Sequence, residues 1–214
     1  PVRLVVELNC ETSWDLIKKD SPAKPVLPYS KKMVIINLDP FAAEGTIDDL
    51  EEKLKVLVEK GYTTYIVNNL AQINILKGYK GVHMIAGPYL YTFNRWAVSF
   101  LENLNIMPVV SPYENSQRNL ESIFETASDR SRVLLCIFSY PALFRMRFKL
   151  PKEYDFTYFS DKEKMGFKVN STEDGSFVMP EYPFSIIDKI ETLKNKGWSR
   201  QFIDFSKTKV LKGD

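Results

Sequence analysis

Short apolar runs alternate with amphipathic stretches along most of the chain. The runs have the length and continuous hydrophobicity of parallel strands that are covered on both faces. They occupy residues 2–9, 33–39, 63–69, 82–87, 106–111, 132–140 and 200–206. A strand followed by a helix, repeated about seven times, predicts an α/β fold with an all-parallel sheet.

The helical pattern is clearest in TIDDLEEKLKVLVEKG at residues 46–61. Thr46 stands at the N-cap position, acidic residues follow in the first turn, and Gly61 ends the helix. Apolar residues at helical spacing form one stripe, made of Ile47, Leu50, Leu54, Leu57 and Val58. Weaker helical patterns cover residues 92–105, 115–128 and 183–197.

One segment, residues 148–183, interrupts this alternation. It is rich in aromatic and β-branched residues and carries turn signals at SDKEKMG and STEDGS, which predicts antiparallel hairpins inserted after the sixth strand. About seven strand–helix units can be counted where a regular β/α barrel has eight. We therefore expect residues 1–214 to form a single β/α barrel domain, with an incomplete barrel, in a fragment of a larger protein.

Composition narrows the functional classes. The 214 residues are 44% hydrophobic, enough for one sizeable core, and the formal net charge is only +2. This balance does not indicate a nucleic-acid binder, although an RNA partner stays open as an alternative. Because no apolar run reaches the roughly 20 residues of a membrane span and PVRLVVELN lacks the order of a signal peptide, we expect a cytoplasmic protein with no membrane partner.

Cysteine and histidine are scarce. The two cysteines, Cys10 and Cys136, cannot build a disulfide framework or a four-cysteine metal site, so no iron-sulfur cluster is expected. The single histidine, His83, excludes a two-histidine zinc site and leaves at most one base for a Ser-His-Asp or Cys-His system. We assign no metal ligands, and the cofactor stays unknown.

Polar side chains gather where the predicted strands end. Parallel strands present their carboxyl ends at one rim, which is the functional face of a β/α barrel. The rim residues are Glu7, Asn9, Asn37, Asp39, Asn68, Asn69, Tyr89, Ser111, Glu114, Ser139, Tyr140 and Asp204. If the four carboxylates converge, they form a hard-metal site or an acid/base pair. The alternative is that these residues only cap the helices that follow.

Residues 93–115, FNRWAVSFLENLNIMPVVSPYEN, resemble a segment of the collagenase-like peptidase family (peptidase family U 32). In that segment an Asn opens a helix and the next strand leads into a Ser-x-Glu-type turn, positions held here by Asn94, Ser111, Glu114 and Asn115. Further similarity lies in NNLAQINILKG, RVLLCIFSYPALFRMRFKL, DKEKMGFKV and PFSIIDKIETLKNKGWSRQFIDF, so that the resemblance covers roughly Asn68 to Phe205.

The resemblance implies a TIM-like barrel and a peptidase with a peptide or protein substrate. The family has no agreed catalytic machinery, so the candidates are residues at or beside the predicted rim: Glu114 and Asp204 as catalytic residues, and Asn94, Ser111, Asn115 and Tyr89 as substrate-binding residues. Two alternatives stay open. One is a non-catalytic barrel that positions a substrate or supports assembly in a larger protein. The other is part of an RNA or quinone hydroxylation enzyme whose cluster ligands lie outside this chain.

Four aromatic residues lie close in sequence to the start of the predicted helix at Asn94: Tyr89, Tyr91, Phe93 and Trp96. A second aromatic group, Tyr140, Tyr154, Phe156, Tyr158 and Phe159, lies in or beside the hairpin segment. Such rings stack on a peptide, a base or a quinone, but they also serve as ordinary packing residues. An aromatic rim favours a positioning module, whereas converging carboxylates favour an enzyme.

Overall fold

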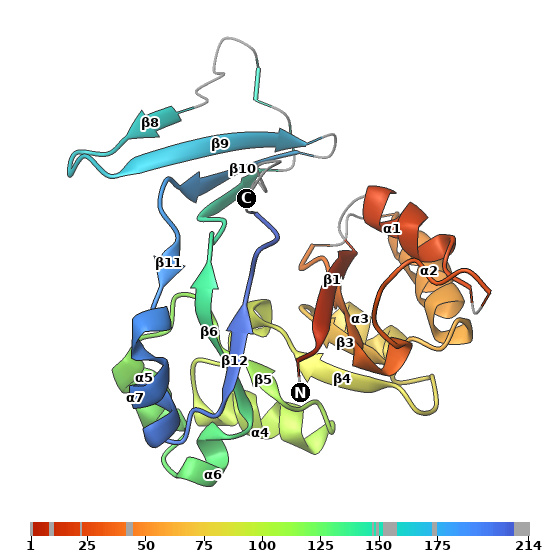
Figure 1. The fold of residues 1–214 in the computed structure, drawn as a ribbon, viewed down its shortest axis with the longest axis horizontal. Coiled ribbons are helices and arrows are strands. Elements are labelled where there is room, and N and C mark those ends of the chain that lie inside the picture. The colour runs from red at the N-terminus through yellow and green to blue at the C-terminus, as the bar shows by residue number, and fades with distance from the viewer. Residues whose placement is uncertain are drawn as a thin grey trace. The chain divides into compact units, whose positions relative to one another are not determined.

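A computed structural model describes residues 2–8, 11–21, 23–41, 45–146, 148, 150–151, 158–172 and 175–207 (Figure 1). The chain folds as two compact units, Pro1–Leu134 and Leu135–Asp214. The boundary falls inside one strand, β6 (Val133–Ser139), which begins in the first unit and ends in the second.

The first unit is a parallel sheet whose strands run β1-β2-β3-β4-β5 and then the start of β6. The strands are β1 (Leu4–Leu8), β2 (Val34–Leu38), β3 (Thr64–Val67), β4 (His83–Ala86) and β5 (Val109–Val110). The connecting helices are α1 (Glu11–Lys18), η1 (Lys31–Met33), α2 (Ile47–Glu59), α3 (Leu70–Leu76), η2 (Pro88–Leu90), α4 (Arg95–Asn103), α5 (Gln117–Ile123) and α6 (Ala127–Arg130). Each strand precedes its parallel neighbour in the chain, which is the connectivity that strand–helix alternation predicts.

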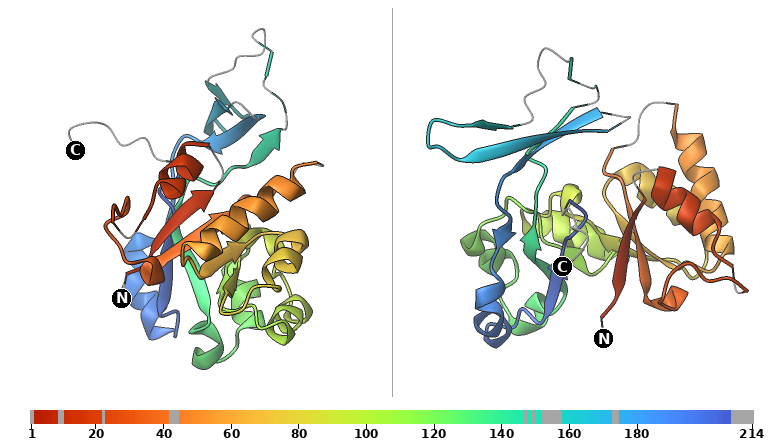
Figure 2. Two further views of the ribbon diagram at one scale, coloured as in Figure 1. Left: turned by 90° about the vertical axis from the view of Figure 1, so that its right-hand side faces the viewer. Right: turned by 45° about the horizontal axis from the view of Figure 1, so that its top comes forward.

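Alternation of side chains along the strands places the main core on the helix face of this sheet. Ile36 and Leu38 of β2 and Tyr65 of β3 are fully buried against apolar residues of α1 and α2, including Ile17 and Leu54. Figures 1 and 2 show α1 and α2 side by side on this face. The intervening strand positions, such as Asn37, therefore lie on the opposite face.

A buried carboxylate fastens the loop before β2. Asp20 is 3% exposed, accepts hydrogen bonds from the Tyr62 hydroxyl (3.0 Å) and the Val26 N–H (2.9 Å), and forms an ion pair with Lys31 (3.1 Å). Burial alone would raise the pKa of Asp20, but these hydrogen bonds and the Lys31 charge outweigh it and lower the pKa. Lys60 Nζ closes the group by donating to the Asp20 carbonyl at 2.6 Å. A loop rich in proline is thus held by charge-assisted bonds.

The second unit contains the rest of β6, which pairs with β11 (Phe184–Ser185) in antiparallel fashion and with β12 (Arg200–Ile203). Figure 1 shows β12 running in the same direction as β6. A 3₁₀ turn, η4 (Ile187–Lys189), and α7 (Ile190–Asn195) connect β11 to β12. A separate antiparallel sheet has the order β7-β10-β9-β8, formed by β7 (Phe144–Met146), β8 (Tyr158–Ser160), β9 (Gly166–Thr172) and β10 (Gly175–Pro180).

The expected α/β fold is confirmed, but the main sheet is not all-parallel, because β11 pairs with β6 in antiparallel fashion. All seven predicted strands form, and β1 pairs only with β2 among the described strands, so the TIM-like sheet is open at this edge. The hairpin region is also present, although its sheet begins at Phe144 rather than at residue 148. No described helix is long and apolar enough to cross a bilayer. Whether the two units act as one domain of a larger protein stays a prediction.

Two helical segments differ from expectation. The pattern at residues 115–128 breaks at Phe124, whose backbone leaves the helical region (φ −112°, ψ 82°) while its side chain is buried, so α5 and α6 are separate. At residues 183–197 the first part pairs with β6 as β11 before the helix starts. In both places a tertiary contact overrides the local helical periodicity.

Candidate functional site

A row of polar side chains crosses the carboxyl ends of β1, β2 and β3. Asn68, directly after β3, donates from Nδ2 to Asn37 Oδ1 at 3.0 Å and to the Leu38 carbonyl at 2.7 Å. Asn37 in turn donates to Glu7 Oε1 over a long 3.5 Å. The register Glu7↔Asn37 places these two side chains at the same level of the sheet. The row therefore runs from a carboxylate to a buried amide.

The orientation of the Asn68 amide is fixed by its partners. Its nitrogen faces two acceptors, one of them a carbonyl that cannot donate, so Oδ1 must point the other way. That oxygen lies against Gly87, where an added Cβ would be only 2.0 Å away. Asn68 is 3% exposed and its Oδ1 has no hydrogen-bond partner. A buried acceptor without a partner costs about 1–3 kcal/mol.

Helix α3 holds the Asn68 loop in place. Asn69 caps the helix by accepting from the Gln72 N–H at 3.0 Å. The buried Gln72 side chain accepts from the Asn68 N–H at 2.7 Å and donates to the Asp39 carbonyl at 2.5 Å. The loops after β2 and β3 are thus tied to one glutamine, which makes this part of the rim rigid.

The loop after β4 supplies a cluster of aromatic rings. Tyr89 meets Tyr91 edge-on, with ring centroids 6.4 Å apart, and meets Tyr113 of the next loop at 6.2 Å. Tyr91 stacks on Phe93 at 5.8 Å. Tyr91 has a positive φ of 50°, which is unfavourable for a bulky residue, and is 54% exposed. We call Tyr89, Tyr91, Phe93 and Tyr113 the aromatic cluster.

Two further buried polar atoms lie beside this cluster. Thr92 is 1% exposed and its hydroxyl has no partner. Asn115, after β5, accepts from Asn119 Nδ2 at 2.7 Å, while its own Nδ2 is buried and without a partner. Asn119 also donates to the Phe93 carbonyl at 3.1 Å and so links the loops after β4 and β5.

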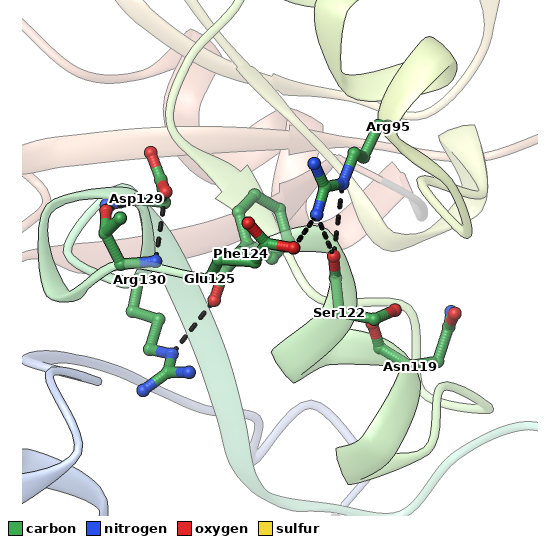
Figure 3. Close-up of polar contacts among 8 residues, drawn as sticks. Arg95, Asn119, Ser122, Phe124, Glu125, Asp129 and Arg130 are labelled. Carbon is green, nitrogen blue, oxygen red and sulfur yellow. Dashed lines mark hydrogen bonds and ion pairs between the residues drawn. The ribbon is translucent and has the colours of Figure 1, made fainter.

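Helices α4 and α5, which follow these loops, are joined by arginine hydrogen bonds to backbone carbonyl groups. Arg95 at the start of α4 donates from Nε (3.1 Å) and Nη2 (2.8 Å) to the Ser122 carbonyl, and it forms an ion pair with Glu125 (Figure 3). Arg130 donates to the Phe124 carbonyl at 2.9 Å. The bonds from Arg95 and Arg130 satisfy carbonyl groups at the end of α5. The bonds from Arg95 also fix α4 against α5 and so position Asn119, which lies in α5.

A capping box starts the short helix α6. Thr126 accepts from the Asp129 N–H at 3.1 Å, and the Asp129 carboxylate accepts from the Thr126 hydroxyl and N–H. Hydrogen bonds from Thr126 lower the pKa of Asp129. The role of this group is structural.

The predicted site residues occupy different places. Asn94 caps α4, accepting from the Ala97 N–H at 2.9 Å. Ser111 is buried and donates its N–H to the Leu134 carbonyl, while Tyr89 and Asn115 belong to the polar and aromatic groups above. Glu114 is exposed in the loop after β5.

Asp204, the other predicted catalytic residue, belongs to the second unit, where its carboxylate accepts from the Ser206 N–H at 2.9 Å. Catalytic roles for Glu114 and Asp204 stay predictions. Sequence reasoning missed Gly87, Thr92 and Asn119. The only signal for Gly87 and Thr92 was their position at and after the end of a predicted strand, and Asn119, inside α5, gave none.

Metal-binding residue types do not cluster in the described part of the chain, where no group of three or more His, Cys, Asp or Glu side chains could hold an ion. His83 is exposed at the amino end of β4. Burial raises the pKa of the Cys136 thiol to about 11, which leaves it protonated and unreactive at neutral pH. Cys10 lies outside the described residues.

No family model, curated protein or solved structure matches this chain.

Proposed function

We propose that the first unit is a ligand-binding β/α module that holds a peptide segment at the carboxyl ends of its strands. The observation that carries the proposal is a set of three buried polar atoms without partners, Asn68 Oδ1, Thr92 Oγ1 and Asn115 Nδ2. They belong to the loops after three consecutive strands, β3, β4 and β5. A peptide backbone offers both N–H and C=O groups, so it can satisfy such a mixture of acceptors and donors.

The aromatic cluster supports binding of this kind. Aromatic rings supply large contact areas at a small entropic cost, and Tyr91 presents an exposed ring beside the unpartnered groups. The cluster favours a substrate-positioning module, because its rings pack against one another at the rim and Tyr91 leaves a ring face free for a ligand. The resemblance to the collagenase-like peptidase family supports a peptide as the ligand.

Peptide hydrolysis is the second candidate. It is favoured by the exposed carboxylate of Glu114, which follows Tyr113 of the aromatic cluster directly. A carboxylate at the carboxyl end of a barrel strand is suitably placed to act as a general base.

Isothermal titration calorimetry with denatured collagen and a pool of unfolded peptides tests the proposal. We expect saturable binding that weakens about threefold to tenfold in Tyr91→Ala, because an aromatic contact contributes about 0.5–1.5 kcal/mol. Tyr182→Ala is the matched control, since Tyr182 is also exposed (74%) but lies in the second unit. Absence of binding, or equal loss in both variants, would reject the module.

The same samples separate binding from turnover. New peptide amino groups that appear during incubation, and that disappear in Glu114→Gln without a change in Tm, would assign hydrolysis to this rim. If the peptides bind but stay intact, the unit positions a substrate without cleaving it.

A further inference from the structure

We infer that Asn68 Oδ1 is the acceptor for a protonated amino group of the bound peptide, an inference that rests on the proposed function. The first support is the direction of the hydrogen bonds in the row that runs from Asn68 through Asn37 to Glu7. Both protons of Asn68 Nδ2 are taken by Asn37 and Leu38, so the amide cannot turn to present a donor. The site is therefore selective for ligand groups that donate.

The charges around the rim favour a cationic donor over a neutral one. The described loop residues that follow β2 to β5 are 39–41, 45–46, 68–69, 87–94 and 111–116, and their charged side chains are Asp39 and Glu114. Glu7, at the other end of the row, adds a third carboxylate on β1. The nearest arginine in sequence, Arg95, is engaged by Glu125. A chain of net charge +2 thus presents an acidic rim at this site.

Access requires movement of the loop that spans residues 87–94, because Gly87 covers Asn68 Oδ1. This closed loop carries unfavourable features that opening can relieve. Tyr91 has a positive φ, and the Thr92 hydroxyl is buried without a partner. Two hydrogen bonds must break or shift, from the Gly87 N–H to the Val67 carbonyl (2.8 Å) and from Asn119 to the Phe93 carbonyl (3.1 Å). An ammonium group then takes the position that Gly87 occupies in the closed state.

The orientation of Asn68 depends on its neighbours. Asn37 is a positioning residue, since it accepts from Asn68 and donates toward Glu7. Replacement of Asn37 by leucine frees one Nδ2 proton of Asn68 and removes the link to the carboxylate. We expect this variant to bind peptides but to lose part of its preference for an amino group.

Three synthetic peptides that share one sequence apart from a single lysine test the inference on the unmodified protein. The first is free of lysine and has a free amino terminus, the second is acetylated and carries one lysine, and the third is acetylated and free of lysine. The first two separate the α-amino group from a lysine side chain as the source of the charge. We expect at least one of them to bind about tenfold or more tightly than the third, as a charge-assisted hydrogen bond predicts.

The outcomes distinguish this inference from the proposed function. Equal binding of all three peptides would overturn the inference and leave the module intact. Binding of none of them would reject both.

A pair of variants adds a second test. Asn68→Leu should abolish the preference for an amino group, whereas Asn74→Leu, on the exposed side of α3, should keep it. Retention of the preference in Asn68→Leu would contradict the assignment. Should Asn68→Leu fail to fold, the three peptides decide alone.

Discussion

Gly87 is required for steric reasons alone, which makes its replacement a sharp test of the rim. Its backbone angles, φ −79° and ψ 166°, suit any residue. A methyl group at this position would lie 2.0 Å from Asn68 Oδ1, 2.6 Å from Asn68 Cγ and 2.9 Å from Ile66 Cγ2. Gly87→Ala must therefore displace the Asn68 side chain.

The displacement has a calculable cost. Asn68 loses its hydrogen bonds to Asn37 and to the Leu38 carbonyl, each with a net contribution of about 1 kcal/mol, and a carbonyl left unpaired costs about 1–3 kcal/mol more. Overpacking against Ile66 adds to this. We expect the free energy of unfolding to fall by about 3–5 kcal/mol in Gly87→Ala.

Urea unfolding followed by circular dichroism measures the effect. Gly78→Ala is the matched control, because its new Cβ would be no closer than 3.6 Å to another atom, the Ile75 carbonyl oxygen. We expect Gly78→Ala to be neutral or stabilising by up to about 1 kcal/mol.

A double-mutant cycle isolates the contact. In an Asn68→Ala background, Gly87→Ala should cost at least about 2 kcal/mol less than in the wild type, since the colliding amide is gone. The reasoning is refuted if Gly87→Ala matches the wild type within about 0.5 kcal/mol, or if its cost is the same in both backgrounds.

Two further predictions concern titratable groups on the helix side of the sheet. Asp20→Asn should lower the free energy of unfolding by about 2–4 kcal/mol at pH 7, because it removes a buried charge that faces Lys31 and Tyr62. The folded-state pKa of Asp20 is lowered, so its contribution to the free energy of unfolding is complete above its unfolded pKa and is lost as the pH falls through its folded pKa. The urea midpoints of wild type and variant should therefore converge in acid. Midpoints that stay equally far apart down to about pH 2 would count against this. Burial raises the pKa values of Tyr62 and Tyr65 above the ordinary 10.0, so stability should be full below pH about 10 and fall as the pH rises further. Urea midpoints between about pH 8 and pH 11 should fall less steeply in Tyr65→Phe than in the wild type, and a flat wild-type profile would contradict this.

Continuous apolar runs made the parallel strands predictable. Runs such as residues 33–39 have no polar alternation, because both faces of the sheet are covered, and β2 and β3 form where these patterns indicated. Local periodicity could not show the break at Phe124 or the pairing of Phe184 with Ser139. Both depend on contacts between residues that are far apart in sequence.

The candidate site was predictable in location but not in detail. Asn115 and Tyr89 follow predicted strands, so their place at the rim could be inferred. The contact of Asn68 with Gly87 depends on the register of β3 against β4, where Val67 pairs with Ala86, and a sequence does not specify this register. Asp20 illustrates the same limit, since an acid in a proline-rich loop gave no sign of burial.

A peptide-induced map of backbone chemical shifts tests the binding face most directly. The protein is labelled with nitrogen-15, and its amide spectrum is recorded with increasing amounts of the tightest-binding unfolded peptide. We predict that the largest changes fall in residues 68–69, 87–94 and 111–116, around the unpartnered atoms of Asn68, Thr92 and Asn115. Changes confined to the antiparallel sheet of β7 to β10, with the rim residues unmoved, would contradict a binding site at the carboxyl ends of the parallel strands.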